Sequence, residues 1–333
     1  MIKKMICIAV CAWMCASCEK SDGGGGFEPV EPPVEKPEEP TTPPSIEDLR
    51  TININDEIMA VVGTNSWNAI AYGNGKYVSV GASGYVTTST DGINWTTPTK
   101  AGTEEWSSVA FGNGKFVAVG RKNVAVSSNG ISWTVYNNVT SNYLLSVAYG
   151  NGKFVMVGSG SYIGVSTDGK TWTNITGVNT GYLWDVIYAD GKFRAVGMEG
   201  YYSTSTNGTT WTVNKFTTNS SSYARHSAYG NNTVVVVGDS GQIWSFTDDD
   251  PNTVNYTNGG YSLYGHISDV IYANGMFVAI SQVYKFEGRT TYTAVIITSV
   301  DGVTWAEPVA IIDENGNAVQ GTNLKVTEIM RAQ

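Results

Sequence analysis

The chain has 333 residues, of which 41% are apolar, 11% are aromatic and 15% are charged, and it contains 38 glycines. A composition rich in glycine, tyrosine and tryptophan favours many short strands joined by tight turns over helices, and one all-β domain can hold about 250 residues. The net charge of -9 is concentrated in residues 18–48, which hold nine acidic residues and two lysines. The rest of the chain is therefore nearly neutral, which excludes a general electrostatic attraction for nucleic acid.

The first 17 residues have the composition of an export signal. Lys3 and Lys4 precede an apolar stretch, residues 5–16, that is too short to cross a bilayer core of about 30 Å. Residues 15–18, Cys-Ala-Ser-Cys, resemble a bacterial lipobox. The resemblance implies that residues 1–17 are a lipoprotein signal peptide and that Cys18 is lipidated and anchors the protein to a membrane. An ordinary signal peptide cleaved nearby is the alternative.

Residues 18–48 are predicted to be a tether between the lipid anchor and a folded domain. Four glycines, residues 23–26, favour flexibility, and the seven prolines and the acidic residues that follow favour an extended chain. No aspartate directly follows Cys18, which resembles lipoproteins sorted to the bacterial outer membrane. We therefore expect an outer-membrane lipoprotein exposed on the cell surface, with a periplasm-facing orientation as the alternative.

Residues 49–333 are predicted to form a β-propeller, because the chain from Trp67 onward repeats itself six times. Each copy contains two hairpin turns, an Asn-Gly or Asp-Gly pair flanked by alternating apolar residues, and therefore four short strands, here named A to D. The A–B hairpins occupy residues 71–81, 110–120, 148–158, 187–197, 228–238 and 271–280. The C–D turns occupy residues 89–95, 127–133, 166–172, 205–211 and 299–305, and the fifth copy has an irregular segment there, residues 248–251.

The repeats imply a closed ring. A single four-stranded antiparallel sheet leaves both apolar faces uncovered, so the copies must pack face to face as blades. Outside the six copies, residues 51–62 alternate like an outermost strand D, and residues 309–312, 318–320 and 324–330 offer three more strands. These pieces from both termini would complete a closing blade. The sequence therefore favours seven blades, with six as the alternative.

The C–D turn carries Ser-Thr-Asp-Gly-Xaa-Xaa-Trp at residues 89–95, and this pattern resembles the Asp-box of sialidase-like and BNR-repeat propellers. The whole repeat resembles those of bacterial surface propellers and photosystem assembly factors. The resemblance implies the fold but no particular activity, because Asp-boxes are structural turns on proteins of unrelated function. The tryptophan that ends the turn recurs in five copies and is predicted to pack in the core: Trp95, Trp133, Trp172, Trp211 and Trp305.

A ligand site is expected on one face of the ring. The A–B and C–D turns, which are short and uniform, form what we call the turn face, and the more varied B–C and D–A connections form the loop face. Function on a propeller usually resides on variable loops held by the rigid ring. The candidate ligand-binding residues cluster at the starts of the A strands on the loop face: Trp67, Trp106, Tyr182, Trp184, Asp185, Arg225, His226 and Asp269.

Aromatic faces beside carboxylate, imidazole and guanidinium groups suit sugar rings or peptide side chains. The alternative interpretation is that the tryptophans only wedge the blades apart. Arg194 stands in strand B where the other copies have valine, and it lies on the same sheet face as Asp185. We therefore expect an ion pair between Arg194 and Asp185 within the fourth copy.

Motifs that suggest catalysis or metal binding lose that meaning when the repeats are aligned. Residues 238–241, Gly-Asp-Ser-Gly, look like a serine protease nucleophile motif but are the B–C loop equivalent of residues 81–84. Asp248, Asp249 and Asp250 replace a turn, lack the ligand spacing of a metal site, and are expected to form a solvated turn. No catalytic residue, metal ligand or cofactor is predicted.

The leading hypothesis is a monomeric, lipid-anchored cell-surface propeller that binds an extracellular glycan or protein through the loop face without catalysis. A sialidase-like glycoside hydrolase is the first alternative, because sialidases share the Asp-box. Of their Phe/Tyr-Arg-Ile-Pro motif, however, only Phe193 and Arg194 are present. An assembly or scaffold factor that binds a nascent partner is the second alternative.

Overall fold

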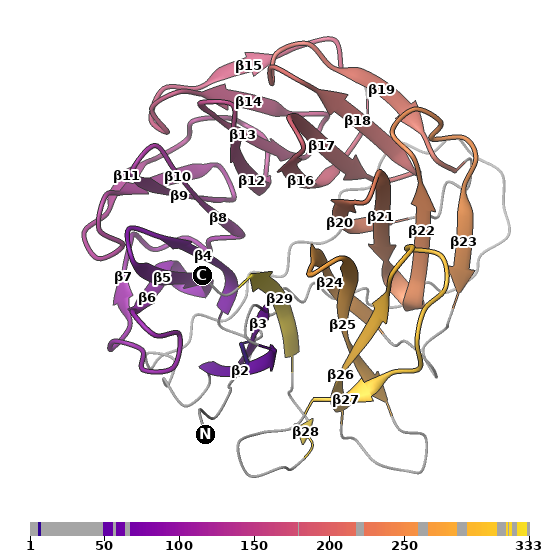
Figure 1. Ribbon diagram of the computed structural model, residues 1–333. Helices are drawn as coiled ribbons and strands as arrows, with labels where there is room; N and C mark the ends of the chain where they lie inside the picture. The colour runs from indigo at the N-terminus through magenta and orange to yellow at the C-terminus, as the bar shows by residue number, and fades with distance from the viewer. Residues whose placement is uncertain are drawn as a thin grey trace, which may run out of the picture.

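Figure 1 shows the computed structural model of the chain, a ring of antiparallel sheets. The structure describes residues 6–7, 49–55, 58–63, 67–311 apart from 179, 218–222, 259–265 and 285–291, and then residues 318, 320–321 and 325–331. Within these residues every regular element is a strand, except two single-turn 3-10 helices. No helix in this part of the chain is long and apolar enough to cross a membrane. The predicted all-β propeller of four-stranded antiparallel blades is confirmed.

Each of the six repeats forms one blade, with its strands in order from A at the centre of the ring to D at the rim. The first three blades consist of β4 (Trp67–Gly73), β5 (Lys76–Gly81), β6 (Tyr85–Ser89) and β7 (Thr99–Lys100); β8 (Ser108–Gly112), β9 (Lys115–Gly120), β10 (Asn123–Ser127) and β11 (Thr134–Tyr136); and β12 (Leu144–Gly150), β13 (Lys153–Gly158), β14 (Ile163–Ser166) and β15 (Thr173–Ile175). The next three consist of β16 (Leu183–Ala189), β17 (Lys192–Gly197), β18 (Tyr201–Ser205) and β19 (Thr212–Lys215); β20 (Ala224–Gly230), β21 (Thr233–Gly238), β22 (Gln242–Phe246) and β23 (Asn255–Asn258); and β24 (His266–Ala273), β25 (Met276–Tyr284), β26 (Tyr292–Ser299) and β27 (Val309–Ala310).

A further sheet, built from both ends of the chain, closes the ring. Its antiparallel order is β1 (Ile6–Cys7), β2 (Leu49–Asn55), β3 (Ile58–Gly63) and β29 (Lys325–Arg331). β29 lies innermost, in contact with the inner strands β24 and β4 of the sixth and first blades. The repeats therefore form six blades, the number given by the six-blade alternative. The termini form the additional closing sheet that the seven-blade prediction requires.

The strand composition that we predicted for the closing sheet was wrong. Three C-terminal strands and one N-terminal strand were expected, whereas a single C-terminal strand pairs with N-terminal strands. The reason is that β27 pairs with β26 and completes the sixth blade, and β28 (Gln320–Gly321) pairs with β26 as well. Because β1 lies within the expected signal peptide, we expect three strands in the mature closing sheet.

The A–B turns form because both of their residues tolerate a positive φ. Asn74 and Gly75 have φ values of 49° and 72°, and Gly73 pairs with Lys76 across this two-residue loop. Such a turn matches the right-handed twist of the two strands that it joins. The same positive φ recurs at the first turn residue of the other five repeat blades: Asn113, Asn151, Asp190, Asn231 and Asn274. Local turn chemistry thus sets the register, and the register decides which side chains face the neighbouring blade.

The C–D turns are held by a repeated set of hydrogen bonds. The Ser89 hydroxyl donates to Oδ1 of Asp91 (2.9 Å) and accepts the N–H of Gly92 (2.8 Å). Oδ1 of Asp91 also accepts the N–H of Asn94 (2.8 Å), and the indole N–H of Trp95 donates to the carbonyl of Gly92 (3.1 Å). The same bonds hold the turns that begin at Ser127, Ser166, Ser205 and Ser299, with asparagine in place of aspartate in the first and third of these. The turn tryptophans are buried or half-buried, so they hold the fold.

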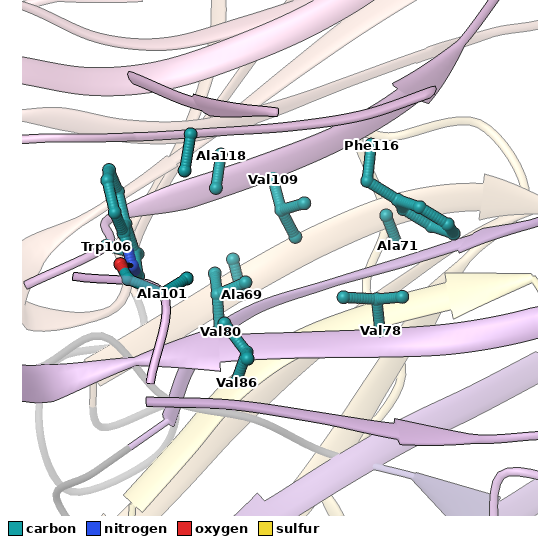
Figure 2. Close-up of a cluster of buried hydrophobic side chains, with 11 residues drawn as sticks. Ala69, Ala71, Val78, Val80, Val86, Ala101, Trp106, Val109, Phe116 and Ala118 are labelled. Atoms are coloured by element: carbon teal, nitrogen blue, oxygen red, sulfur yellow. Dashed lines mark hydrogen bonds between the residues drawn. The ribbon is translucent and has the colours of Figure 1, made fainter. Parts of the chain in front are cut away.

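The core consists of layers of apolar side chains between neighbouring blades. Figure 2 shows the layer between the first two blades, where Val80 of one blade and Val109 and Phe116 of the next are buried side chains of one cluster. Trp106 lies at one end of this layer and is fully buried.

Two glycine contacts are repeated at the blade interfaces. The glycine that ends strand A lies against an aromatic ring of the next blade, so that a Cβ at Gly73 would overlap the ring of Phe111. The glycine of the C–D turn lies against a strand B valine of the preceding blade, as Gly130 does against Val78. Substitution of either glycine would therefore push two blades apart.

Candidate functional site

Five of the six A strands, all except β8, carry a β-bulge at their loop-face ends. The register of β16 shifts between Leu183 and Asp185, and that of β20 shifts between Ala224 and His226. The residues skipped by the pairing are Trp184 and Arg225, both half-buried, whereas the residue before each of them is buried. A bulge bends its strand and re-aims the side chain of the extra residue. Trp184 and Arg225 are thereby brought toward the loop face on two adjacent blades.

Four side chains of these blades stack in a row that we call the aromatic–arginine surface: Tyr182, Trp184, Arg225 and Tyr223. The rings of Tyr182 and Trp184 stack with centroids 5.7 Å apart and planes inclined by 26°. The guanidinium carbon of Arg225 lies 4.2 Å from the ring centroid of Trp184 and 5.5 Å from that of Tyr223. All four side chains are half-buried. Cation–π contacts of this kind contribute about 0.5–2 kcal/mol each, so the row is held in place before any ligand arrives.

A carboxylate fixes the guanidinium of Arg225. Asp239 lies in η3 (Asp239–Gly241), the B–C connection of the fifth blade, and accepts Nε of Arg225 at its Oδ1 (3.1 Å) and Nη2 at its Oδ2 (3.0 Å). Both side chains are partly exposed, at 20% and 25%. Among the described residues, Nη1 of Arg225 has no hydrogen-bond partner. Two-point fixation by a carboxylate orients this remaining edge of the guanidinium.

His226 and Asp269 form a second contact, between the fifth and sixth blades. Nδ1 of His226 lies 3.7 Å from Oδ1 of Asp269, and the same oxygen accepts the N–H of Val270 at 2.7 Å. The histidine side chain is 32% exposed and the aspartate 11%. The structure therefore brings these two predicted site residues together, beside the aromatic–arginine surface but outside its stacked row.

Asp185 is a structural residue, and its assignment to a ligand site is corrected. It is buried, its Oδ1 accepts the hydroxyl of Ser146 (3.1 Å), and its Oδ2 accepts the N–H (3.0 Å) and hydroxyl (2.9 Å) of Ser227. These bonds connect the inner strands of the third, fourth and fifth blades. Since it is buried and both of its carboxylate oxygens accept hydrogen bonds from neighbouring blades, Asp185 stabilises the ring.

Trp67 and Trp106 are also corrected. They are 1% and 0% exposed, and the indole N–H of Trp106 donates to the carbonyl of Ala101 at 2.9 Å. Trp67 occupies the first position of β4, as Leu183 does in β16, and Trp106 lies two residues before β8, whereas Trp184 occupies the bulged second position of β16. The wedging interpretation therefore holds for Trp67 and Trp106. An alignment of the A strands residue by residue would have separated them from Trp184.

The predicted ion pair between Arg194 and Asp185 was wrong. Arg194 is fully buried and pairs with Asp248 of the fifth blade, with Nη2 to Oδ2 at 2.6 Å and Nε to Oδ1 at 3.1 Å. Its Nη1 donates to the carbonyl of Ala189 at 2.6 Å, so the side chain extends toward the turn face, away from Asp185.

Asp248 is not part of a solvated turn, as we had expected. Its side chain is 5% exposed, and the Tyr202 hydroxyl and the Lys192 ammonium also donate to it. Burial raises the pKa of Asp248, but the hydrogen bonds from Arg194, Tyr202 and Lys192 outweigh burial and hold that pKa below its usual value. The guanidinium carbon of Arg194 also lies 3.5 Å from the ring centroid of Tyr229. This cluster lies on the turn-face side and is satisfied internally, so it belongs to the scaffold.

The protease-like motif at residues 238–241 is a B–C connection in the structure, as aligned. Ser240 has φ 60° inside η3, and Ser83 has φ 50° inside the equivalent η2 (Ala82–Gly84) of the first blade. The role of Asp239 in holding Arg225 was missed, although its replacement of Ala82 is a visible departure from the repeat. Within the described residues, no three His, Cys, Asp or Glu side chains are grouped so that they could hold a metal ion. Cys18 lies outside the described residues.

Comparison with models of known protein families finds no match. Comparison with curated protein sequences finds none either. Among solved structures, the chain is similar to "YCF48 bound to D1 peptide", with a TM-score of 0.57, 16% identity, and coverage of 79% of this chain and 87% of that one. It is also similar to the WD40 β-propeller domain of Doa1 (TM-score 0.57, 16% identity, 81% and 94% covered) and to the WD40 repeats of RRP9 (TM-score 0.57, 9% identity, 82% and 86% covered). At these identities the likeness shows the β-propeller fold alone.

Proposed function

We propose that this protein is a lipid-anchored propeller on the surface of the bacterial outer membrane that binds an extracellular protein or glycan without catalysis. Ligand contact takes place at the aromatic–arginine surface. The observation that carries the proposal is the row of four half-buried, stacked side chains, two of which stand at bulges on adjacent blades. Tryptophan, tyrosine and arginine are the residues that most often dominate binding energy at interfaces.

A protein partner is the better supported of the two ligand classes. Sugar rings stack on an open aromatic face, but the guanidinium of Arg225 already lies over the ring of Trp184. The row instead offers flat ring edges and, at Nη1 of Arg225, N–H donors that suit the carbonyl and carboxylate oxygens of a peptide. YCF48, which has a similar fold, has been solved bound to a peptide. A scaffold or assembly role is a special case of this class.

The binding test uses purified protein against two probe sets, a displayed random-peptide library and a glycan array. Trp184→Ala and Arg225→Gln remove two members of the row. Tyr256→Ala is the matched control, because Tyr256 is an aromatic residue of the fifth blade that is 51% exposed and lies outside the row. We expect saturable peptide binding that Trp184→Ala weakens at least about tenfold, or about 1.4 kcal/mol, and that Tyr256→Ala leaves intact.

The outcomes of this test separate the classes. Binding to the glycan array that is lost in both Trp184→Ala and Arg225→Gln would show that the ligand is a carbohydrate. Binding of either kind that survives Trp184→Ala would contradict the proposed surface. Hydrolysis of fluorogenic sialosides or other glycosides would favour the glycoside hydrolase alternative, and such turnover would contradict a purely binding role.

The membrane anchor is tested separately. Each acyl CH₂ buried in a membrane contributes about 0.8 kcal/mol, so several chains on one cysteine hold a protein firmly. We expect Cys18→Ala to abolish incorporation of labelled palmitate and to shift the protein from the membrane fraction to the soluble fraction. Digestion of the wild-type protein by protease added to intact cells would support surface exposure, and protection from it would support the periplasmic orientation.

A further inference from the structure

The tether joins the propeller on the same face as the aromatic–arginine surface. β2 begins at Leu49, which pairs with Gly63, the last residue of β3. Gly63 in turn precedes Trp67, which starts the inner strand of the first blade and pairs with Gly81 at its loop-face end. Leu49, the first described residue after the tether, therefore lies at the loop face.

The composition of this preceding chain suits an aromatic surface. Residues 27–48 contain seven prolines, and three Pro-Xaa-Xaa-Pro spacings occur at residues 29–32, 37–40 and 40–43. Proline-rich segments populate the extended polyproline II conformation, which loses little entropy on binding and docks on surfaces lined by aromatic rings. Glutamates are interspersed among these prolines, for example Glu31 and Glu38, and a carboxylate is a suitable acceptor for Nη1 of Arg225.

The tether is also long enough. At about 3.1 Å per residue, an extended proline-rich chain from residue 48 back to residue 32 spans about 50 Å. A folded domain of about 285 residues has an expected radius of gyration of only about 19 Å. The proline-rich part therefore reaches any point of the loop face from its attachment at Leu49.

We propose that residues 27–44 of the tether dock on the aromatic–arginine surface of their own propeller, with prolines along the ring edges of Tyr182, Trp184 and Tyr223 and a glutamate at Nη1 of Arg225. This inference rests on the proposed function, since both use one surface. A tethered segment has an effective concentration of about 1 mM. Docking with an intrinsic dissociation constant of about 0.1 mM therefore occupies the surface about nine-tenths of the time and weakens the binding of an outside peptide about tenfold.

The experiment uses the lipidated protein in isolated membranes. A photo-crosslinking amino acid replaces Val34 in the proline-rich part or, as a matched control, Gly24 in the glycine part. Irradiation is followed by digestion and mass spectrometry. We expect crosslinks from position 34 to peptides that contain residues 182–184 or 223–225, and we expect Trp184→Ala and Arg225→Gln to reduce their yield at least about fivefold, with Tyr256→Ala having no effect.

Co-expressed light and heavy isotope-labelled chains distinguish docking within one chain from exchange between two. Crosslinks confined to one isotope support the proposal, and mixed-isotope crosslinks overturn it in favour of a second copy. Crosslinks from position 34 that are unchanged by Trp184→Ala, or equal in yield to those from position 24, also overturn it. If peptide binding still depends on Trp184 when no tether crosslink forms, only this inference fails. If both measurements are insensitive to Trp184→Ala, the proposed function fails as well.

Discussion

Arg194 and Asp248 form a buried ion pair between the fourth and fifth blades, and Arg194 stands in strand B where four other blades have a valine against a turn glycine of the next blade. The valine–glycine contacts are Val78 with Gly130, Val117 with Gly169, Val155 with Gly208 and Val235 with Gly302. The departure from the repeat in strand B of the fourth blade and the departure in the C–D turn of the fifth blade thus compensate each other. Tyr202, whose counterparts in strand C are aliphatic, donates its hydroxyl to the same carboxylate.

The first prediction concerns this pair. Arg194→Val leaves Asp248 buried without its main partner, so we expect it to lower the free energy of unfolding by about 3–5 kcal/mol. The combination of Arg194→Val, Asp248→Gly and Tyr202→Phe removes the buried guanidinium, carboxylate and hydroxyl together, and it should recover most of that loss. Urea unfolding of the single and combined variants measures both effects. A combined variant no more stable than Arg194→Val would show that the pair is not interchangeable with valine and glycine.

The same pair distinguishes the fourth blade from its near-identical neighbours. Docking of this blade against any regular C–D turn would bury an unpaired guanidinium, which is strongly unfavourable. Repeat proteins are prone to misassembly between similar units. We therefore expect the combined variant, although stable, to refold with a lower yield of monomer than the wild-type chain. Equal refolding yields, measured by size-exclusion chromatography after dilution from urea, would remove this role.

The second prediction is a pH dependence of the C–D turns. The N–H of Thr171 is the main cause that lowers the pKa of Asp168 to about 2, from a usual value near 3.8. A carboxyl group with a lowered pKa in the folded state adds stability above its unfolded pKa, and that stability is lost as the pH falls from about 4 to about 2. Asp168→Asn should reduce the fall of the urea midpoint across that interval, because asparagine keeps the same turn at Asn129 and Asn207 and has no proton to bind. Identical acid profiles for Asp168→Asn and wild type would contradict this.

The third prediction tests the glycine contact between blades. A Cβ on Gly112 would overlap the ring of Tyr149, so we expect Gly112→Ala to destabilise the protein by about 1–3 kcal/mol. The fourth and sixth blades already have alanine at the equivalent position, Ala189 and Ala273. Ala189→Gly is therefore the matched control and should change stability by less than about 1 kcal/mol. Thermal unfolding of both variants measures the difference.

The fourth prediction concerns ring closure. β29 is the C-terminal strand of the closing sheet and contacts the first and sixth blades. Truncation after residue 324 should lower Tm by about 10 °C or more, since an open ring exposes the apolar faces of two blades. Truncation after residue 331 is the control and should leave Tm unchanged. A full Tm in the shorter chain would show that the ring closes without β29.

The sequence alone predicts the blades because their signals are local. Asn-Gly and Asp-Gly turns favour positive φ whatever surrounds them, and a repeat of such turns requires stacked four-stranded sheets. The propeller and the loop face as the place of the variable residues follow from this pattern. The six repeat blades of the structure confirm the predicted propeller.

Only the tertiary structure decided which of the variable residues lie together. Trp184 occupies the bulged position of its strand and is half-buried, whereas Trp67 and Trp106 do not occupy such a position and are buried. Strand pairing assigned β27 to the sixth blade and left β29 alone to close the ring. The partner of Arg194 is 54 positions away, in the next blade. Contacts between blades depend on how whole sheets pack against each other, and no turn or alternation within a single repeat contains that information.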